Sequence, residues 1–440
     1  GEYEQAIKDY SKAIELNPMS DSAYNNRGIA YYNKVDKAHA LSDYSKAIEI
    51  NHSNSEAYLN RGNIYKDKGD IDNVISDYSE SIKINPQNAH AYFNRGLIYQ
   101  GKKEFNLAIS DYSKAIEIEP TYSEAYFNRG NIYKDDGDID YAILDYSNVI
   151  KINPNNDAAY YNRGNSFHIK GEIEQALMDY SKAIEINPNI VNAYHNRGAI
   201  YNNKGNFNEA IADYNKVIEL NPKYDRAYHG RGVSYYYKSE FDNAIADYSK
   251  AIEINPNYAE AYNNRGTAYD KKGELDKALS DYTTAVNINP KKVETYVSRG
   301  VIYASKGDFQ KAFSDFNKAL EINPQFADAF NQRGIVYARK GEFAFAISDF
   351  NKAIEINPQN ADFYNSRGFT YKLMGRLNEA IADFDRALAL NPRHTLSLIN
   401  RGNTYAVKKY KNNACADWKQ ACELGACNNY TQAKKMRYCE

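Results

Sequence analysis

Two side chains that could do chemistry return along this chain every 34 residues. An Arg-Gly pair occurs twelve times, first at Arg27 and last at Arg401, and an aspartate follows each arginine sixteen residues later. A guanidinium can hold a carboxylate or a phosphate through two parallel hydrogen bonds. The arginines could therefore form a basic strip for an anionic ligand, or each could pair with its own aspartate.

An asparagine stands directly before most of these arginines. Its amide offers both a hydrogen-bond donor and an acceptor, so a row of such amides can follow an extended peptide backbone without reading its sequence. The eight asparagines, called the asparagine ladder below, are Asn26, Asn60, Asn94, Asn128, Asn162, Asn196, Asn264 and Asn400. The other four repeats carry Gly230, Ser298, Gln332 and Ser366 at this place.

Catalytic chemistry finds little support in the sequence. His168, His195 and His229 fall in successive repeats, and helix pairs repeat at about 10 Å, which is too far apart for one metal ion. The chain has no glycine-rich phosphate loop after a strand, no nucleophile elbow and no zinc spacing. We expect no enzyme activity, no metal and no cofactor.

Each repeat is expected to form two helices. The first half places apolar and aromatic residues at helical spacing and ends at Gly69-Asp70, a helix stop followed by a helix start. The second half continues the period to Asn85-Pro86, where proline ends the helix. Helices of about 14 residues are marginal alone, so neighbouring repeats must hold them.

An antiparallel arrangement of these two helices predicts which residues meet. Gly62 lies opposite Tyr78 and leaves room for its ring, although glycine costs about 1 kcal/mol inside a helix. The same antiparallel arrangement places Arg61 close to Asp77 and Arg95 close to Asp111. Because an aspartate accompanies every arginine, we favour partly buried internal ion pairs over a basic ligand strip.

The full pattern resembles the tetratricopeptide repeat family. One repeat shows the pattern as Tyr92, Gly96, Tyr99, Ala108, Tyr112, Ala115 and Pro120. The resemblance implies an all-α fold, in which tandem helix-turn-helix repeats form a right-handed superhelix, or α-solenoid. We expect a half repeat over 1–20, twelve repeats over 21–428, and a C-terminal capping helix over 429–440.

The family also implies a groove along the first helices, which the residues just before each arginine would face. The asparagine ladder resembles the peptide-gripping groove of O-linked N-acetylglucosamine transferases. The alternative is that these asparagines only solvate the helix face and recur because repeats were duplicated. The lysine clamp of the family's chaperone-binding members is absent, since Leu59 and Phe93 stand where a lysine is needed.

Apolar residues stand two places before the arginine in four successive repeats. They are Leu59, Phe93, Phe127 and Tyr161. Such a stripe suits apolar side chains of a bound segment. Packing between successive repeats is an equal alternative.

Composition limits the classes of partner. The net charge of −2 gives no bulk attraction for nucleic acid, and no apolar stretch is long enough to insert in a membrane. We expect a non-catalytic scaffold that binds a protein or an extended peptide. The alternatives are a structural array that self-associates end to end, and the substrate-recruiting part of a larger enzyme. The chain begins in mid-repeat, so we expect its native N-terminus to be missing.

All four cysteines lie in the last 26 residues. If a final helix from about Asn429 to Cys439 folds back around Gly425, Cys415 faces Cys439, and Cys422 and Cys427 close the turn. This geometry favours two disulfides over four buried free thiols. Disulfides would favour an exported or periplasmic location, although the localisation itself stays unknown.

Overall fold

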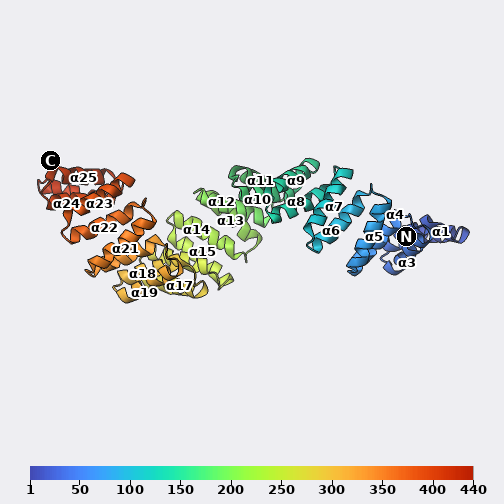
Figure 1. The fold of residues 1–440 in the computed structure, drawn as a ribbon, viewed down its shortest axis with the longest axis horizontal. Coiled ribbons are helices and arrows are strands. Elements are labelled where there is room, and N and C mark those ends of the chain that lie inside the picture. The colour runs from blue at the N-terminus through green and yellow to red at the C-terminus, as the bar shows by residue number, and fades with distance from the viewer. Residues whose placement is uncertain (440) are drawn as a thin grey trace. The chain divides into compact units, whose positions relative to one another are not determined.

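The chain folds as α-helices alone throughout residues 1–439, the part that the computed structural model describes. The chain divides into two compact units, one from Gly1 to Lys204 and one beginning at Gly205. Figure 1 shows the helices of each unit following one another as antiparallel pairs. The expected all-α fold of tandem helix-turn-helix repeats is therefore confirmed.

The first unit holds twelve helices within the described residues. They are α1 (Glu2–Leu16), α2 (Asp21–Asn33), α3 (Lys37–Ile50), α4 (Ser55–Lys68), α5 (Ile71–Ile84), α6 (Ala89–Gly101), α7 (Phe105–Ile118), α8 (Ser123–Asp136), α9 (Ile139–Ile152), α10 (Asp157–Lys170), α11 (Ile173–Ile186) and α12 (Val191–Asn203).

The second unit continues the pattern and adds a short last helix. Its described helices are α13 (Phe207–Leu220), α14 (Asp225–Tyr237), α15 (Phe241–Ile254), α16 (Ala259–Lys271), α17 (Leu275–Ile288), α18 (Val293–Ser305), α19 (Phe309–Ile322), α20 (Ala327–Arg339), α21 (Phe343–Ile356), α22 (Ala361–Leu373), α23 (Leu377–Leu390), α24 (Thr395–Val407), α25 (Lys411–Glu423) and α26 (Asn428–Lys435).

Local sequence sets the ends of these helices. Asn54 caps α4, because its side chain accepts a hydrogen bond from the backbone N–H of Ala57. Gly69 ends α4 in the left-handed conformation at φ 73°, which glycine adopts without steric cost. Asn85 ends α5 at φ −125° and ψ 88°, outside the helical region, as expected for a residue before proline.

Close approach within each helix pair depends on glycine. A Cβ atom on Gly62 would lie 2.7 Å from Cε1 of Tyr78, so no larger residue fits without moving the ring. Tyr78 itself is completely buried. The second-helix rings and the alanines beside them form the core between neighbouring pairs.

The C-terminal cap differs from the prediction. The helix expected to reach Cys439 ends at Lys435, because Arg437 adopts a positive φ of 55° that is incompatible with a right-handed helix. Disulfides join Cys415 to Cys439, with their Cα atoms 5.6 Å apart, and Cys422 to Cys427. None of the described helices combines the length and the apolar character that a membrane span needs.

Candidate binding surface on the first helices

In eleven of the twelve repeats, the arginine of the Arg-Gly pair holds the aspartate sixteen residues later. Arg129 donates to Asp145 through Nε at 2.9 Å and through Nη2 at 2.8 Å. Asp145 is only 1% exposed. The same two-bond pairing joins Arg27 to Asp43, Arg61 to Asp77, Arg95 to Asp111, Arg163 to Asp179, Arg231 to Asp247, Arg265 to Asp281, Arg299 to Asp315, Arg333 to Asp349, Arg367 to Asp383 and Arg401 to Asp417.

The arginine also reaches back to the preceding repeat, which the sequence analysis missed. Arg129 Nη1 donates to the hydroxyl of Ser113 at 2.8 Å. The rings of Tyr126 and Tyr133 lie 5.7 and 5.9 Å from its guanidinium carbon. Arg129 therefore joins α8 to α9 and to α7. The sequence carried a signal for this contact, because a small polar residue follows the second-helix ring in repeat after repeat.

The electrostatics agree with an internal role for these arginines. The hydrogen bonds that Arg95 donates to Asp111 raise the pKa of Arg95, against the opposing effect of burial. Burial raises the pKa of Asp145, and the hydrogen bonds from Arg129 oppose that rise. A buried carboxylate in this position depends on its cation. The arginines are consequently occupied, and they do not form the basic ligand strip that was the alternative.

Members of the asparagine ladder are all half-buried, but their amides have different uses. Four donate to a side chain of the preceding repeat: Asn60 to Asn25 at 3.1 Å, Asn196 to Asn165 at 2.9 Å, Asn264 to His229 at 2.9 Å, and Asn400 to Asn365 at 3.0 Å. Asn162 donates to the carbonyl of Ala158 in its own helix. Within residues 1–439, the side chains of Asn26, Asn94 and Asn128 make no hydrogen bond.

The residue 35 positions before each ladder asparagine explains much of this difference in hydrogen bonding. Asn25 and Asn365 offer a carbonyl oxygen to the following ladder asparagine. Leu59 occupies that position before Asn94, and Phe93 occupies it before Asn128. Neither has an acceptor atom, so the amides of Asn94 and Asn128 keep their hydrogen-bonding capacity for another molecule.

The interruption of the ladder at Gly230 has a steric cause. A Cβ atom at this position would lie 2.7 Å from Cε1 of Tyr214 in the preceding repeat, and Gly230 is buried. The ring of Tyr214 therefore takes the space that a ladder asparagine would need.

We predict that Gly230→Asn lowers the stability instead of completing the ladder. The overpacked side chain should cost about 1 to 3 kcal/mol, less any gain in helix propensity. Urea unfolding followed by circular dichroism measures this change. Gly101→Asn is the matched control, since no atom lies within 4 Å of a Cβ there, and a loss of equal size in both variants would contradict the steric explanation.

The apolar stripe of Leu59, Phe93, Phe127 and Tyr161 is half-buried against the repeat's own core. The ring of Phe93 lies 5.7 Å from that of Tyr112 and 4.8 Å from that of Tyr122, measured between centroids. Phe127 and Tyr161 approach Tyr146 and Tyr180 at 5.8 and 6.0 Å. Of these contacts, only that between Phe93 and Tyr122 reaches the first helix of the next repeat, since Tyr122 directly precedes α8, and the other three lie within one helix pair.

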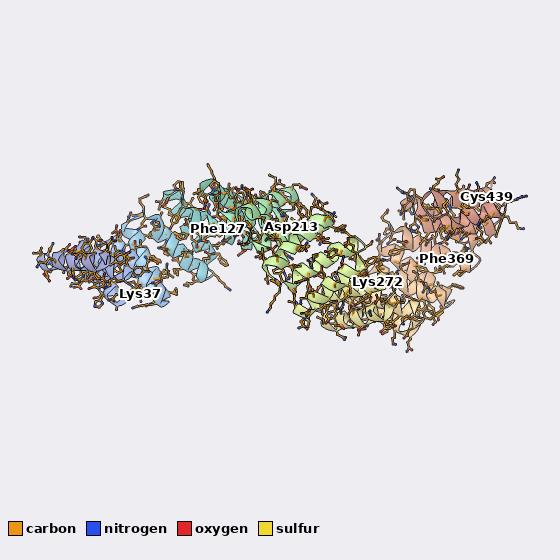
Figure 2. All side chains as sticks on the ribbon, turned by 180° about the vertical axis from the view of Figure 1, so that it is seen from behind. Lys37, Phe127, Asp213, Lys272, Phe369 and Cys439 are labelled. Carbon is orange, nitrogen blue, oxygen red and sulfur yellow. A yellow bond between two sulfur atoms is a disulfide. The ribbon has the colours of Figure 1, made fainter. Side chains whose placement is uncertain are left out.

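A second apolar surface, which the sequence analysis did not single out, lies on the first helices of the last three repeats. A cavity of about 320 Å³ opens among α20, α22 and α24, and its lining includes Ile335, Phe369 and Leu373. Phe369 is labelled on its helix in Figure 2. The sequence signal was the residue two places after the arginine, which is apolar in Val301, Ile335 and Phe369 in succession.

The histidines and cysteines in the part of the chain that the structure describes form no metal-binding group. No group of three or more His, Cys, Asp or Glu side chains is placed to hold a metal ion there. His229 accepts a hydrogen bond from the amide of Asn264, and the four cysteines are joined in disulfides.

Comparison with known proteins identifies the repeat. Models described as TPR repeat match residues 1–35, 62–103, 130–169, 164–205 and 234–273. Models described as tetratricopeptide repeat match 21–54, 43–73, 89–122, 111–143, 191–224, 259–292, 293–326, 327–360 and 361–394. The chain belongs to the tetratricopeptide repeat family. Tetratricopeptide repeat proteins are generally non-catalytic scaffolds that bind protein or peptide partners.

Several solved tetratricopeptide repeat structures are similar to this one. A protein from Parabacteroides merdae is 24% identical with a TM-score of 0.48, and the match covers 53% of this chain and 93% of that one. MamA is 33% identical with a TM-score of 0.35, over 37% of this chain and 96% of that one. Yeast Tom70 is 16% identical with a TM-score of 0.47, over 94% of each chain. A search of curated proteins found no match.

Proposed function

We propose that this tetratricopeptide repeat protein is a non-catalytic scaffold whose first helices bind an extended peptide segment of a partner protein. The observation that carries the proposal is the pair of half-buried amides of Asn94 and Asn128, which make no hydrogen bond within residues 1–439. Each can accept from a backbone N–H and donate to a backbone C=O. Their repeats are adjacent, so both can hold one strand of peptide.

The apolar stripe supports the same segment of groove. Phe93, Phe127 and Tyr161 accompany Asn94, Asn128 and Asn162 on neighbouring first helices, and each ring is partly exposed. Amides can fix the peptide backbone, while these rings contact its side chains. Asn60, Asn196 and Asn264 donate to side chains of the preceding repeat, and we assign these three a structural role.

The arrangement of charge supports a protein partner over nucleic acid. The repeated arginines are paired internally, and the chain as a whole carries a net charge of −2. Tetratricopeptide repeat proteins are generally non-catalytic, and this supports a binding function without catalysis.

We predict that Asn94→Ala combined with Asn128→Ala weakens peptide binding roughly tenfold, because two sites of backbone hydrogen bonding are lost at about 1 kcal/mol or less each. Peptides selected from a displayed random library against the unchanged protein would carry a dye, and fluorescence anisotropy would give their Kd for each variant. The double variant should unfold at the same temperature as the unchanged protein.

Asn60→Ala is the matched control. Its amide donates to Asn25, so we expect it to lower stability and to leave the Kd of those peptides unchanged. Equal binding by the double variant and the unchanged protein would refute the peptide-binding role of Asn94 and Asn128.

A further inference from the structure

The cavity among α20, α22 and α24 combines exposed apolar rings and chains with polar groups. Phe369 is 40% exposed and Leu373 is 51% exposed, which is unusual for large apolar side chains one helical turn apart. Ile335 on α20 completes the apolar lining. A volume of about 320 Å³ is at the small end of ligand pockets, and it suits one large apolar side chain with its adjoining backbone.

Amides at the edge of this cavity are arranged for a peptide backbone. Oδ1 of Asn365 accepts from Asn400 Nδ2 at 3.0 Å and from Ser397 at 3.2 Å. The Nδ2 group of Asn365 and the Oδ1 atom of Asn400 have no hydrogen-bond partner in the part of the chain that the structure describes, and both residues line the cavity. One donor and one acceptor are therefore available within a single site.

Two cations beside the cavity lack a carboxylate partner within residues 1–439. Arg339 lines the cavity itself. Lys372 lies three residues after Phe369 on the same face of α22, and its Nζ atom is 5.8 Å from the centre of that ring. The lysines that follow α18 and α20 do have carboxylate partners, since Lys306 pairs with Asp276 and Lys340 pairs with Glu342. Burial lowers the pKa of Lys372, so a neighbouring anion would stabilise its charged form.

We propose that this cavity binds a peptide segment in which a large apolar residue stands next to an aspartate or glutamate. The apolar side chain enters between Phe369, Leu373 and Ile335, the carboxylate pairs with Lys372 or Arg339, and the amides of Asn365 and Asn400 hold the backbone. The inference rests on the proposed peptide-binding function and specifies a second place and a composition for the bound segment. Charge complementarity decides the occupant, because both unpaired groups are cations.

Four dye-labelled peptides of equal length test this specificity. Their central residues are Asp-Leu-Glu, Ser-Leu-Ser, Asp-Ser-Glu and Lys-Leu-Lys, each flanked by the same Gly-Ser sequence, and fluorescence anisotropy measures binding to the whole chain. We expect the Asp-Leu-Glu peptide to bind at least tenfold more tightly than the other three. Its affinity should fall as salt increases, since screening weakens exposed charge pairs.

Two variants locate the binding site. Phe369→Ser should weaken binding of the Asp-Leu-Glu peptide at least tenfold, and Lys372→Gln, which keeps much of the aliphatic stem, should abolish most of its preference over Ser-Leu-Ser. Leu144→Ser, which removes another exposed apolar side chain in the other compact unit, should leave the binding of this peptide unchanged. Similar binding of all four peptides, or unchanged binding by both Phe369→Ser and Lys372→Gln, would overturn the proposal.

The result is separable from the proposed function of Asn94 and Asn128. If library-selected peptides depend on Asn94 and Asn128 while the Asp-Leu-Glu peptide ignores Phe369 and Lys372, the specificity of this cavity is refuted and the peptide-binding function stands. If the Asp-Leu-Glu peptide depends on Phe369 and Lys372 while no peptide depends on Asn94 and Asn128, the cavity is supported and the ladder hypothesis is refuted.

Discussion

Replacing Arg129 by alanine should lower the free energy of unfolding by about 3 to 5 kcal/mol, because the change leaves the Asp145 carboxylate buried without its cation. Asp145 is only 1% exposed, and Arg129 supplies it with two hydrogen bonds. The variant also removes the donor to Ser113 that joins α8 to the preceding repeat. Urea unfolding followed by circular dichroism measures the loss. Since repeats contact mainly their neighbours, it should be concentrated in the transition of the first unit.

Two further variants distinguish the effect of leaving a buried charge unpaired from the effect of removing any charge. Replacing Arg129 by methionine together with Asp145 by leucine should cost less than Arg129→Ala alone, because no unpaired charge remains. Lys114 pairs with Glu117 on the exposed surface, and Lys114→Ala should change stability by less than about 0.5 kcal/mol. A double variant as unstable as Arg129→Ala would show that packing around the pair matters more than its charge.

Much of the fold could be predicted because glycine or proline marks most of the helix ends in this chain. Gly69 and Pro86 bracket α5 as predicted, and the antiparallel arithmetic placed Gly62 against Tyr78. It also predicted that Arg61 approaches Asp77, which the structure places at hydrogen-bond distance. Such pairings depend only on helix geometry within one repeat, so a single sequence is enough to predict them.

Contacts between repeats were harder to predict, because they depend on residues that vary from one repeat to the next. Asn94 and Asn400 occupy the same position in their repeats, yet only Asn400 has a hydrogen-bond acceptor 35 residues earlier. The end of α26 was also missed. It depends on the left-handed conformation of Arg437, and arginine carries no sequence signal for a positive φ.

Alkaline unfolding should be steep, because many second-helix tyrosines are buried as neutral phenols. Burial raises the pKa of Tyr282 to about 12 from its ordinary value of about 10, and it raises the pKa of Tyr78 and Tyr248 still further. The same buried position holds Tyr44, Tyr112, Tyr146 and Tyr180, whose pKa values are also raised by burial. Above pH 10 these side chains ionise in the unfolded chain and stay protonated in the folded one.

The sign of this linkage makes stability fall as the pH rises. The contribution of each raised pKa is complete below pH 10 and is lost progressively as the pH rises toward 12 and beyond. One such tyrosine costs about 1.4 kcal/mol per pH unit, and seven acting independently cost about 10 kcal/mol per pH unit. We therefore expect cooperative unfolding between about pH 10 and 12, measured by far-ultraviolet circular dichroism together with phenolate absorbance.

Phenylalanine substitutions test the cause directly. Phe316, Phe350 and Phe384 already occupy this place in three repeats, so the core accepts the smaller group. The hydroxyls of Tyr44 and Tyr248 donate no hydrogen bond within residues 1–439, so Tyr44→Phe with Tyr248→Phe should leave stability at pH 7 almost unchanged and move the alkaline transition to higher pH. Tyr237→Phe is the matched control, because Tyr237 is 64% exposed and should not move the transition. A transition that both sets of substitutions leave in place would exclude the buried phenols as its cause.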